Sequence, residues 1–161
     1  MKSETQDKLQ GIFDKYRAKQ AEILKVQEKL RSEREIFLQG FEKKIKEIIR
    51  PIFKEIGESL KSQGQGYEVT HRREAFDSHG NIMSARIQLE IFPDGQRAQP
   101  GERPFISFIA NSVQKEIWTY VSTMMPGHGG CAGQRNAYSL DEVTPEAVEE
   151  EVLYLVANCF G

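Results

Sequence analysis

Apolar side chains recur every seven residues along the first part of the chain. The positions that keep this spacing are Leu9, Tyr16, Ile23, Leu30 and Phe37. A seven-residue repeat keeps one seam of an α-helix facing a partner helix, as in a coiled coil. Good helix formers such as Glu, Lys, Gln and Leu dominate up to a glycine-containing turn at 63–66. The pattern predicts a long helix over residues 1–64 whose N-terminal part is a coiled-coil oligomerisation segment.

The apolar stripe of this helix is wider than the seam of a two-stranded coiled coil. Ile12, Leu24 and Val26 flank the heptad row, while the second row of the seam contains Gln20 and Gln27. A wide stripe suits a helix with more than one neighbour, and polar seam residues weaken a two-stranded zipper. We expect self-association into a dimer or a tetramer. The pattern leaves the number and the direction of the helices open.

The hydrophobic spacing changes after Phe37 to the broad i, i+3, i+4, i+7 stripe of a helix that lies on a globular core. This stripe consists of Phe41, Ile45, Ile48, Ile49, Ile52, Phe53, Ile56 and Leu60. We expect residues 41–62 to pack on the C-terminal domain and residues 5–38 to project from it.

Pro51 lies inside the predicted helix. Because proline lacks a backbone N–H and clashes with the preceding turn, we expect a kink near 49–51. The alternative is a helical hairpin that folds back at a glycine. The glycines of the segment are Gly11, Gly40 and Gly57. None of them lies in the polar cluster that usually forms a reversal.

Residues 66–161 are predicted to form a small α+β head domain. Side chains alternate with a period of two, which is typical of half-buried strands, over residues 67–76, 82–91 and 113–122. Phe105, Ile106, Phe108 and Ile109 begin a further predicted strand. Short turns between them predict a four-stranded antiparallel β-meander. Thr144 and Pro145 are an N-cap and a first helical residue. They begin a C-terminal helix whose apolar stripe packs on the sheet, which completes an α+β fold.

Charge and composition exclude several classes of protein. Residues 1–64 contain 15 Lys and Arg against 11 Asp and Glu, and residues 65–161 contain 7 against 13. An acidic head domain argues against nucleic-acid binding, which usually uses a basic face. Two cysteines are too few for a disulfide framework. No stretch is apolar enough for a membrane span or a signal peptide, so we expect a cytoplasmic protein.

The segment 126–136 is rich in glycine and is the candidate ligand loop. Its residues of interest are Gly127, His128, Gly129, Gly130, Cys131 and Arg135. Glycine backbones approach ligands closely, and successive amides beside an arginine can bind an anion. The Lys-Ser/Thr pair of a P-loop is missing, and no helix follows directly. A flexible connection to the last helix is the simpler interpretation.

The remaining chemistry is sparse. His128 and Cys131 would make a nucleophilic pair only if the fold brought them together. His71, His79 and His128 have no spacing typical of a metal site, so we expect no metal and no cofactor. The sequence favours an oligomeric protein–protein interaction module, leaning away from an enzyme. The alternative is a small-ligand-binding or enzymatic head that uses the glycine-rich loop.

Overall fold

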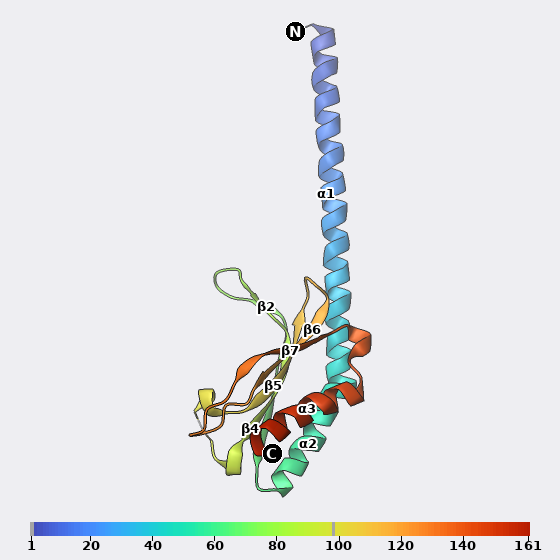
Figure 1. Cartoon of the computed structure of the whole chain (residues 1–161). Helices are drawn as coiled ribbons and strands as arrows, with labels where there is room; N and C mark the ends of the chain where they lie inside the picture. Colours follow the sequence, from blue (N-terminus) through green and yellow to red (C-terminus); the bar gives the residue numbers. More distant parts are fainter. Residues whose placement is uncertain (1, 98) are drawn as a thin grey trace. The chain divides into compact units, whose positions relative to one another are not determined.

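The computed structural model describes residues 2–97 and 99–161, and its fold is α+β. The helices are α1 (Ser3–Lys44), the π-helical turn η1 (Ile45–Ile49), α2 (Arg50–Ser62) and α3 (Pro145–Phe160). The strands are β1 (Gly66–Arg72), β2 (Ala75–Phe76), β3 (Ile82–Met83), β4 (Arg86–Phe92), β5 (Phe105–Asn111), β6 (Glu116–Ser122) and β7 (Ala132–Tyr138). Figure 1 labels all of them except β1 and β3. Short 3-10 turns are η2 (Pro93–Gly95), η3 (Pro100–Glu102) and η4 (Leu140–Glu142). The chain divides into two units, residues 1–36 and residues 37–161.

The first unit is helical from Ser3 and exposes its apolar face. Its exposed large apolar side chains are Leu9, Ile12, Phe13, Tyr16, Ile23, Leu24, Val26, Leu30 and Ile36. The predicted long helix is therefore present, and the coiled coil stays a prediction. No helix among the described residues is long and apolar enough to cross a membrane.

The second unit begins with the last turns of α1. Phe37, Phe41, Ile45 and Ile49 are buried in the core of this unit, together with residues of α2. The expected packing of residues 41–62 on the C-terminal domain is thus observed. Phe37, Phe41, Ile45, Ile49 and Phe53 recur every four residues, which keeps them on the same side of the helical segment.

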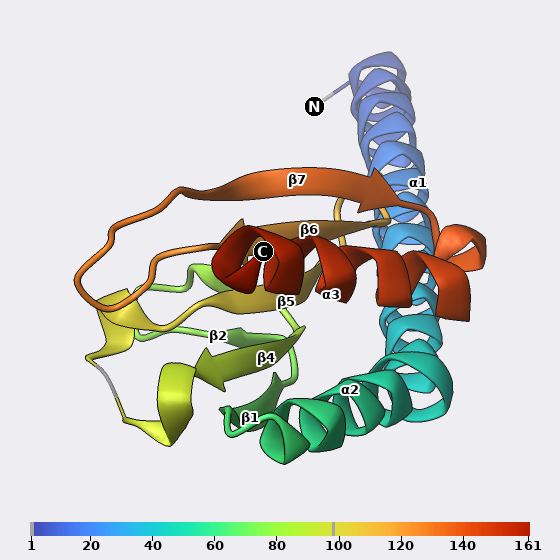
Figure 2. The same cartoon turned by 60° about the horizontal axis from the view of Figure 1, so that its bottom comes forward.

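The helical path changes character immediately before Pro51. The N–H of Arg50 donates to the carbonyl of Ile45, five residues back, which is the π-helical pattern. Pro51 has no N–H to donate and its ring crowds the preceding turn, so the wider turn absorbs the defect without ending the helix. Figure 2 shows that α2 runs in a different direction from the last turns of α1.

The sheet has five antiparallel strands in the order β1-β4-β5-β6-β7. The prediction of four strands is wrong, because β7 begins inside the segment that we expected to be a flexible connection and adds a fifth strand to the sheet. The meander itself is observed, and β2 and β3 form a separate two-stranded extension of its first hairpin. The sequence of β7, Ala-Gly-Gln-Arg-Asn-Ala-Tyr, lacks the β-branched residues and the apolar alternation that identify strands.

One face of the sheet carries the helices α2 and α3 (Figure 2). The core between them is formed by strand residues such as Ile87, Leu89 and Phe108 and by helix residues such as Phe53 and Leu155. As predicted, α3 starts after an N-cap threonine. The Thr144 side chain accepts a hydrogen bond from the amide of Ala147 at 3.2 Å.

Candidate functional site

The glycine-rich segment forms the tip of the β6–β7 hairpin. The amide of Thr123 donates to the carbonyl of Cys131 at 2.8 Å, and the amide of Met125 donates to that of Gly129 at 3.0 Å. The amide of Cys131 donates to the Thr123 hydroxyl at 3.1 Å. Gly127 has φ of 74° and closes the turn in a backbone conformation that favours glycine. Several amides of the segment therefore bond within the hairpin, which leaves fewer for an anion.

Gly130 is required by the hairpin itself. Its φ is 156°, and a Cβ atom at this position would lie 2.4 Å from the carbonyl oxygen of Thr123. A side chain here would push the two strands apart. Substitution of Gly130 therefore disturbs the hairpin and does not isolate a contribution to ligand binding.

His128 and Cys131 are both exposed on this hairpin. The amide of His128 donates to the carbonyl of Met125 at 3.2 Å. Among the described residues, no hydrogen bond joins the two side chains. The structure thus gives no geometric support for a thiolate–imidazole pair.

A β-bulge in β7 turns consecutive side chains toward α3. Trp118 pairs with Ala137 and Tyr120 pairs with Gln134, so Thr119 lies opposite two residues, Arg135 and Asn136. The extra residue resets the alternation of the strand. As a result Arg135, Asn136 and Tyr138 all reach the face covered by α3.

These three side chains converge on Glu151 of α3, which is fully buried. Asn136 Nδ2 donates to Glu151 Oε1 at 2.6 Å, and the Tyr138 hydroxyl donates to the same oxygen at 2.5 Å. Arg135 Nη1 lies 2.7 Å from Oε2 and forms the ion pair. The guanidinium also stacks on Tyr154, 3.9 Å from the ring centroid. The buried charge is therefore paired, and it ties the edge strand β7 to α3.

The surroundings of Tyr138 and Arg135 favour a neutral phenol and a charged guanidinium. Burial raises the pKa of Tyr138, and the hydrogen bond to Glu151 raises it further. Burial by itself lowers the pKa of Arg135, but the hydrogen bond and the attraction of Glu151 outweigh it, so the net shift is upward. Tyr138 stays neutral and Arg135 stays charged throughout the physiological range.

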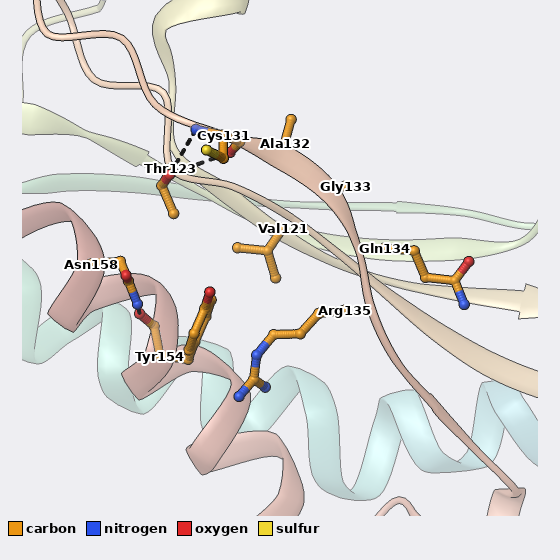
Figure 3. Close-up of a pocket in the computed structure, with 9 residues that line it drawn as sticks. All are labelled: Val121, Thr123, Cys131, Ala132, Gly133, Gln134, Arg135, Tyr154 and Asn158. Carbon is orange, nitrogen blue, oxygen red and sulfur yellow. Dashed lines mark hydrogen bonds between the residues drawn. The ribbon is translucent and has the colours of Figure 1, made fainter.

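A cavity of about 450 Å³ lies beside this cluster. Figure 3 shows the nine lining residues, which come from the end of β6, the hairpin, β7 and α3: Val121, Thr123, Cys131, Ala132, Gly133, Gln134, Arg135, Tyr154 and Asn158. Arg135 is the charged member of this set. The cavity has the size of a small-molecule site. Of the predicted loop, it includes Cys131 and Arg135.

A second polar cluster surrounds His71 at the junction of η1, α2 and β1. Arg50 Nη2 lies 2.9 Å from Nδ1 of His71, and Nε2 lies 3.0 Å from Glu42 Oε2. Because a guanidinium only donates, Nδ1 accepts and the ring proton is on Nε2, which donates to Glu42. Both ring nitrogens are thus engaged. Within the described part of the chain, no group of three or more His, Cys, Asp and Glu side chains could hold a metal ion.

No family model, no curated protein and no solved structure matches this chain. Function is therefore inferred from the residues of the chain itself.

The predicted interface residues divide between the two units. Leu9, Tyr16, Ile23 and Leu30 are exposed, whereas Phe37 is 5% exposed and belongs to the core of the second unit. The interface considered below therefore excludes Phe37.

The sequence analysis did not identify Glu151, Tyr138 or Tyr154 as members of the polar cluster between β7 and α3. The available signal was the place of Glu151 on α3, because it lies on the apolar stripe of Val148, Val152 and Leu155. A carboxylate at an inward position of an amphipathic helix needs a partner, which the sequence alone did not identify.

Proposed function

We propose that the protein is a homo-oligomeric interaction module in which residues 9–30 form the contact between copies. The observation that carries this proposal is the apolar face of the first unit. Eight large apolar side chains from Leu9 to Leu30 are between 41% and 62% exposed. Monomeric proteins rarely leave so many large apolar side chains in water along one face.

A second copy is the partner that the sequence of this face fits best. The spacing of Leu9, Tyr16, Ile23 and Leu30 gives each copy the same seam, so two copies complement one another. Gln20 and Gln27 interrupt the seam and can hydrogen bond to residues of a partner helix, which fixes the register. Residues 1–36 contain nine basic and seven acidic side chains, so two copies repel one another only weakly.

The energetics allow a stable assembly. Complete burial of one large apolar side chain contributes about 1.5–3 kcal/mol, so burial of the exposed half contributes about 1 kcal/mol. Eight such side chains on each of two chains sum to roughly 16 kcal/mol, against an association cost of about 4–15 kcal/mol. The net free energy favours association. Loss of the apolar burial at two seam positions is enough to favour the monomer instead.

The test is a pair of double variants with the same change in charge. Ile23→Asp with Leu30→Asp places two carboxylates in the seam, and Ala18→Asp with Ser32→Asp places two on the opposite side of the helix. Light scattering after size exclusion should show a smaller mass for the seam variant alone, while circular dichroism shows a folded second unit in both. An unchanged mass for the seam variant would refute this interface, and equal losses in both would indicate helix destabilisation instead.

A further inference from the structure

Gly133 is the second residue of β7, with paired residues on both sides of it, and glycine normally weakens a strand. It pairs with Val121 and faces α3. Its φ lies outside the positive region that requires glycine, and a Cβ atom built on it would meet no described atom within 4 Å. Neither backbone conformation nor packing within the described chain explains the missing side chain. Glycine inside a strand marks a bulge, a bend, or a place where a ligand or another backbone approaches. The bulge of β7 lies at Arg135 and Asn136, and the free space above Gly133 fits the approach of a ligand.

The free space above Gly133 is the cavity of Figure 3. Val121 and the ring of Tyr154 supply apolar walls of the cavity. Thr123 and Asn158 lie toward the end of the cavity that is farther from Gln134. None of the nine lining residues is Asp or Glu. An anionic group in the cavity would therefore meet no carboxylate on its lining.

Arg135 is held in place before any ligand arrives. Nη1 is paired with Glu151 and the guanidinium plane rests on Tyr154. Its other N–H groups have no acceptor among the described residues. A guanidinium with one edge fixed and another free presents parallel donors that match a carboxylate. Because the side chain is already ordered, binding would cost little conformational entropy.

We propose that this cavity binds a small molecule with a carboxylate group and a flat apolar body. The carboxylate accepts hydrogen bonds from the free edge of Arg135. The apolar body lies over Gly133, between Val121 and Tyr154. This site lies entirely within the second unit, so it does not depend on the self-association proposed above.

The experiment uses the full chain labelled with ¹⁵N and follows amide shifts during titration. Benzoate is the probe. Benzamide is the control, because it has a similar shape and no charge. Gly133→Val occupies the space directly above residue 133, where the apolar body is proposed to lie, while keeping Arg135, and the absence of described atoms within 4 Å of a Cβ atom there predicts a thermal stability no lower than that of the wild type. Gly133→Ala is the milder variant and places a single methyl group in the same space. Arg135→Lys keeps the charge and removes the planar fork.

With the wild type we expect benzoate to cause saturable shifts at residues of β7 and α3. Benzamide binding to the wild type, and benzoate binding to Arg135→Lys, should each be about tenfold weaker. Gly133→Val should show no saturable shifts. Equal affinities for benzoate and benzamide would overturn the proposal. Benzoate shifts that persist in Gly133→Val, or no saturable shifts in the wild type, would do so as well.

A titration with N-acetyl-phenylalanine separates two sources of the carboxylate. This compound presents the group as the end of a protein chain does. Tighter binding than benzoate would assign the site to a chain terminus, and weaker binding would assign it to a free acid. Failure of these titrations leaves the mass of the assembly unaffected, so the two proposals fail separately.

Discussion

Removing the two charges of the Arg135–Glu151 pair singly and together should give an unusual order of stability. The perturbations are Glu151→Met, Arg135→Met and the double variant, in which methionine keeps an unbranched chain of similar length. Glu151 is fully buried, whereas the Arg135 side chain is 28% exposed. The two single variants therefore leave different groups without a partner.

The magnitudes follow from what each variant leaves behind. Arg135→Met leaves a buried carboxylate without its cation, which costs about 3–5 kcal/mol. Glu151→Met leaves Asn136 and Tyr138 without their acceptor, and Arg135 can turn to water, so the cost is about 2–3 kcal/mol. In the double variant no buried charge remains. Its stability should therefore be close to that of Glu151→Met and higher than that of Arg135→Met.

Urea unfolding followed by the fluorescence of Trp118 measures this order. Trp118 is the single tryptophan and lies in β6, next to β7. Because the double variant should be about as stable as Glu151→Met, the double-variant cycle should give a coupling close to the cost of Arg135→Met, about 3–5 kcal/mol. If the two single costs simply add, so that the double variant is the least stable of the three, the pairing inferred here is wrong.

Three further outcomes are expected. Gly57→Ala should lower the free energy of unfolding by about 1–3 kcal/mol, because its Cβ atom would lie 2.3 Å from the ring of Tyr67 on β1. Gly11→Ala has no atom within 4 Å of its Cβ and should raise the helix content. Equal effects of the two variants in thermal melts would contradict this. Cys131 should react with a thiol reagent at pH 8 well before Cys159, since burial raises the pKa of the Cys159 thiol to about 11; equal rates would contradict it. The folded state holds the Tyr138 phenol proton more tightly than the unfolded chain, so stability should fall as pH rises past the ordinary pKa of 10.0. Tyr138→Phe should lessen that fall in urea titrations, and an unchanged slope would count against the raised pKa.

The elements with a strong hydrophobic period were predictable from the sequence. The spacing of apolar residues located the long helix, and the change of spacing after Phe37 identified the residues that reach the core. The strands β4, β5 and β6 carry buried apolar residues. Alternation revealed β4 and β6, and the run of phenylalanine and isoleucine at 105–109 revealed β5. Thr144 and Pro145 marked the start of α3 because capping is a local property.

Strand β7 and its cluster were not predictable in the same way. β7 is held by the hairpin, by one sheet edge and by Glu151, so its stability comes from tertiary contacts more than from its own residues. The bulge that brings Arg135 and Asn136 to one face depends on a register shift, which has no period to detect. Arg135 was singled out for its charge in a glycine-rich segment, while its partners lie on a different element.

The central claim is that the apolar face of residues 9–30 joins copies of this chain. Sedimentation equilibrium of the full chain over a wide range of concentrations tests it most directly. Self-association through this face predicts a mass of two or four times 18.4 kDa that falls toward the monomer on dilution. A mass of 18.4 kDa at every concentration would contradict it.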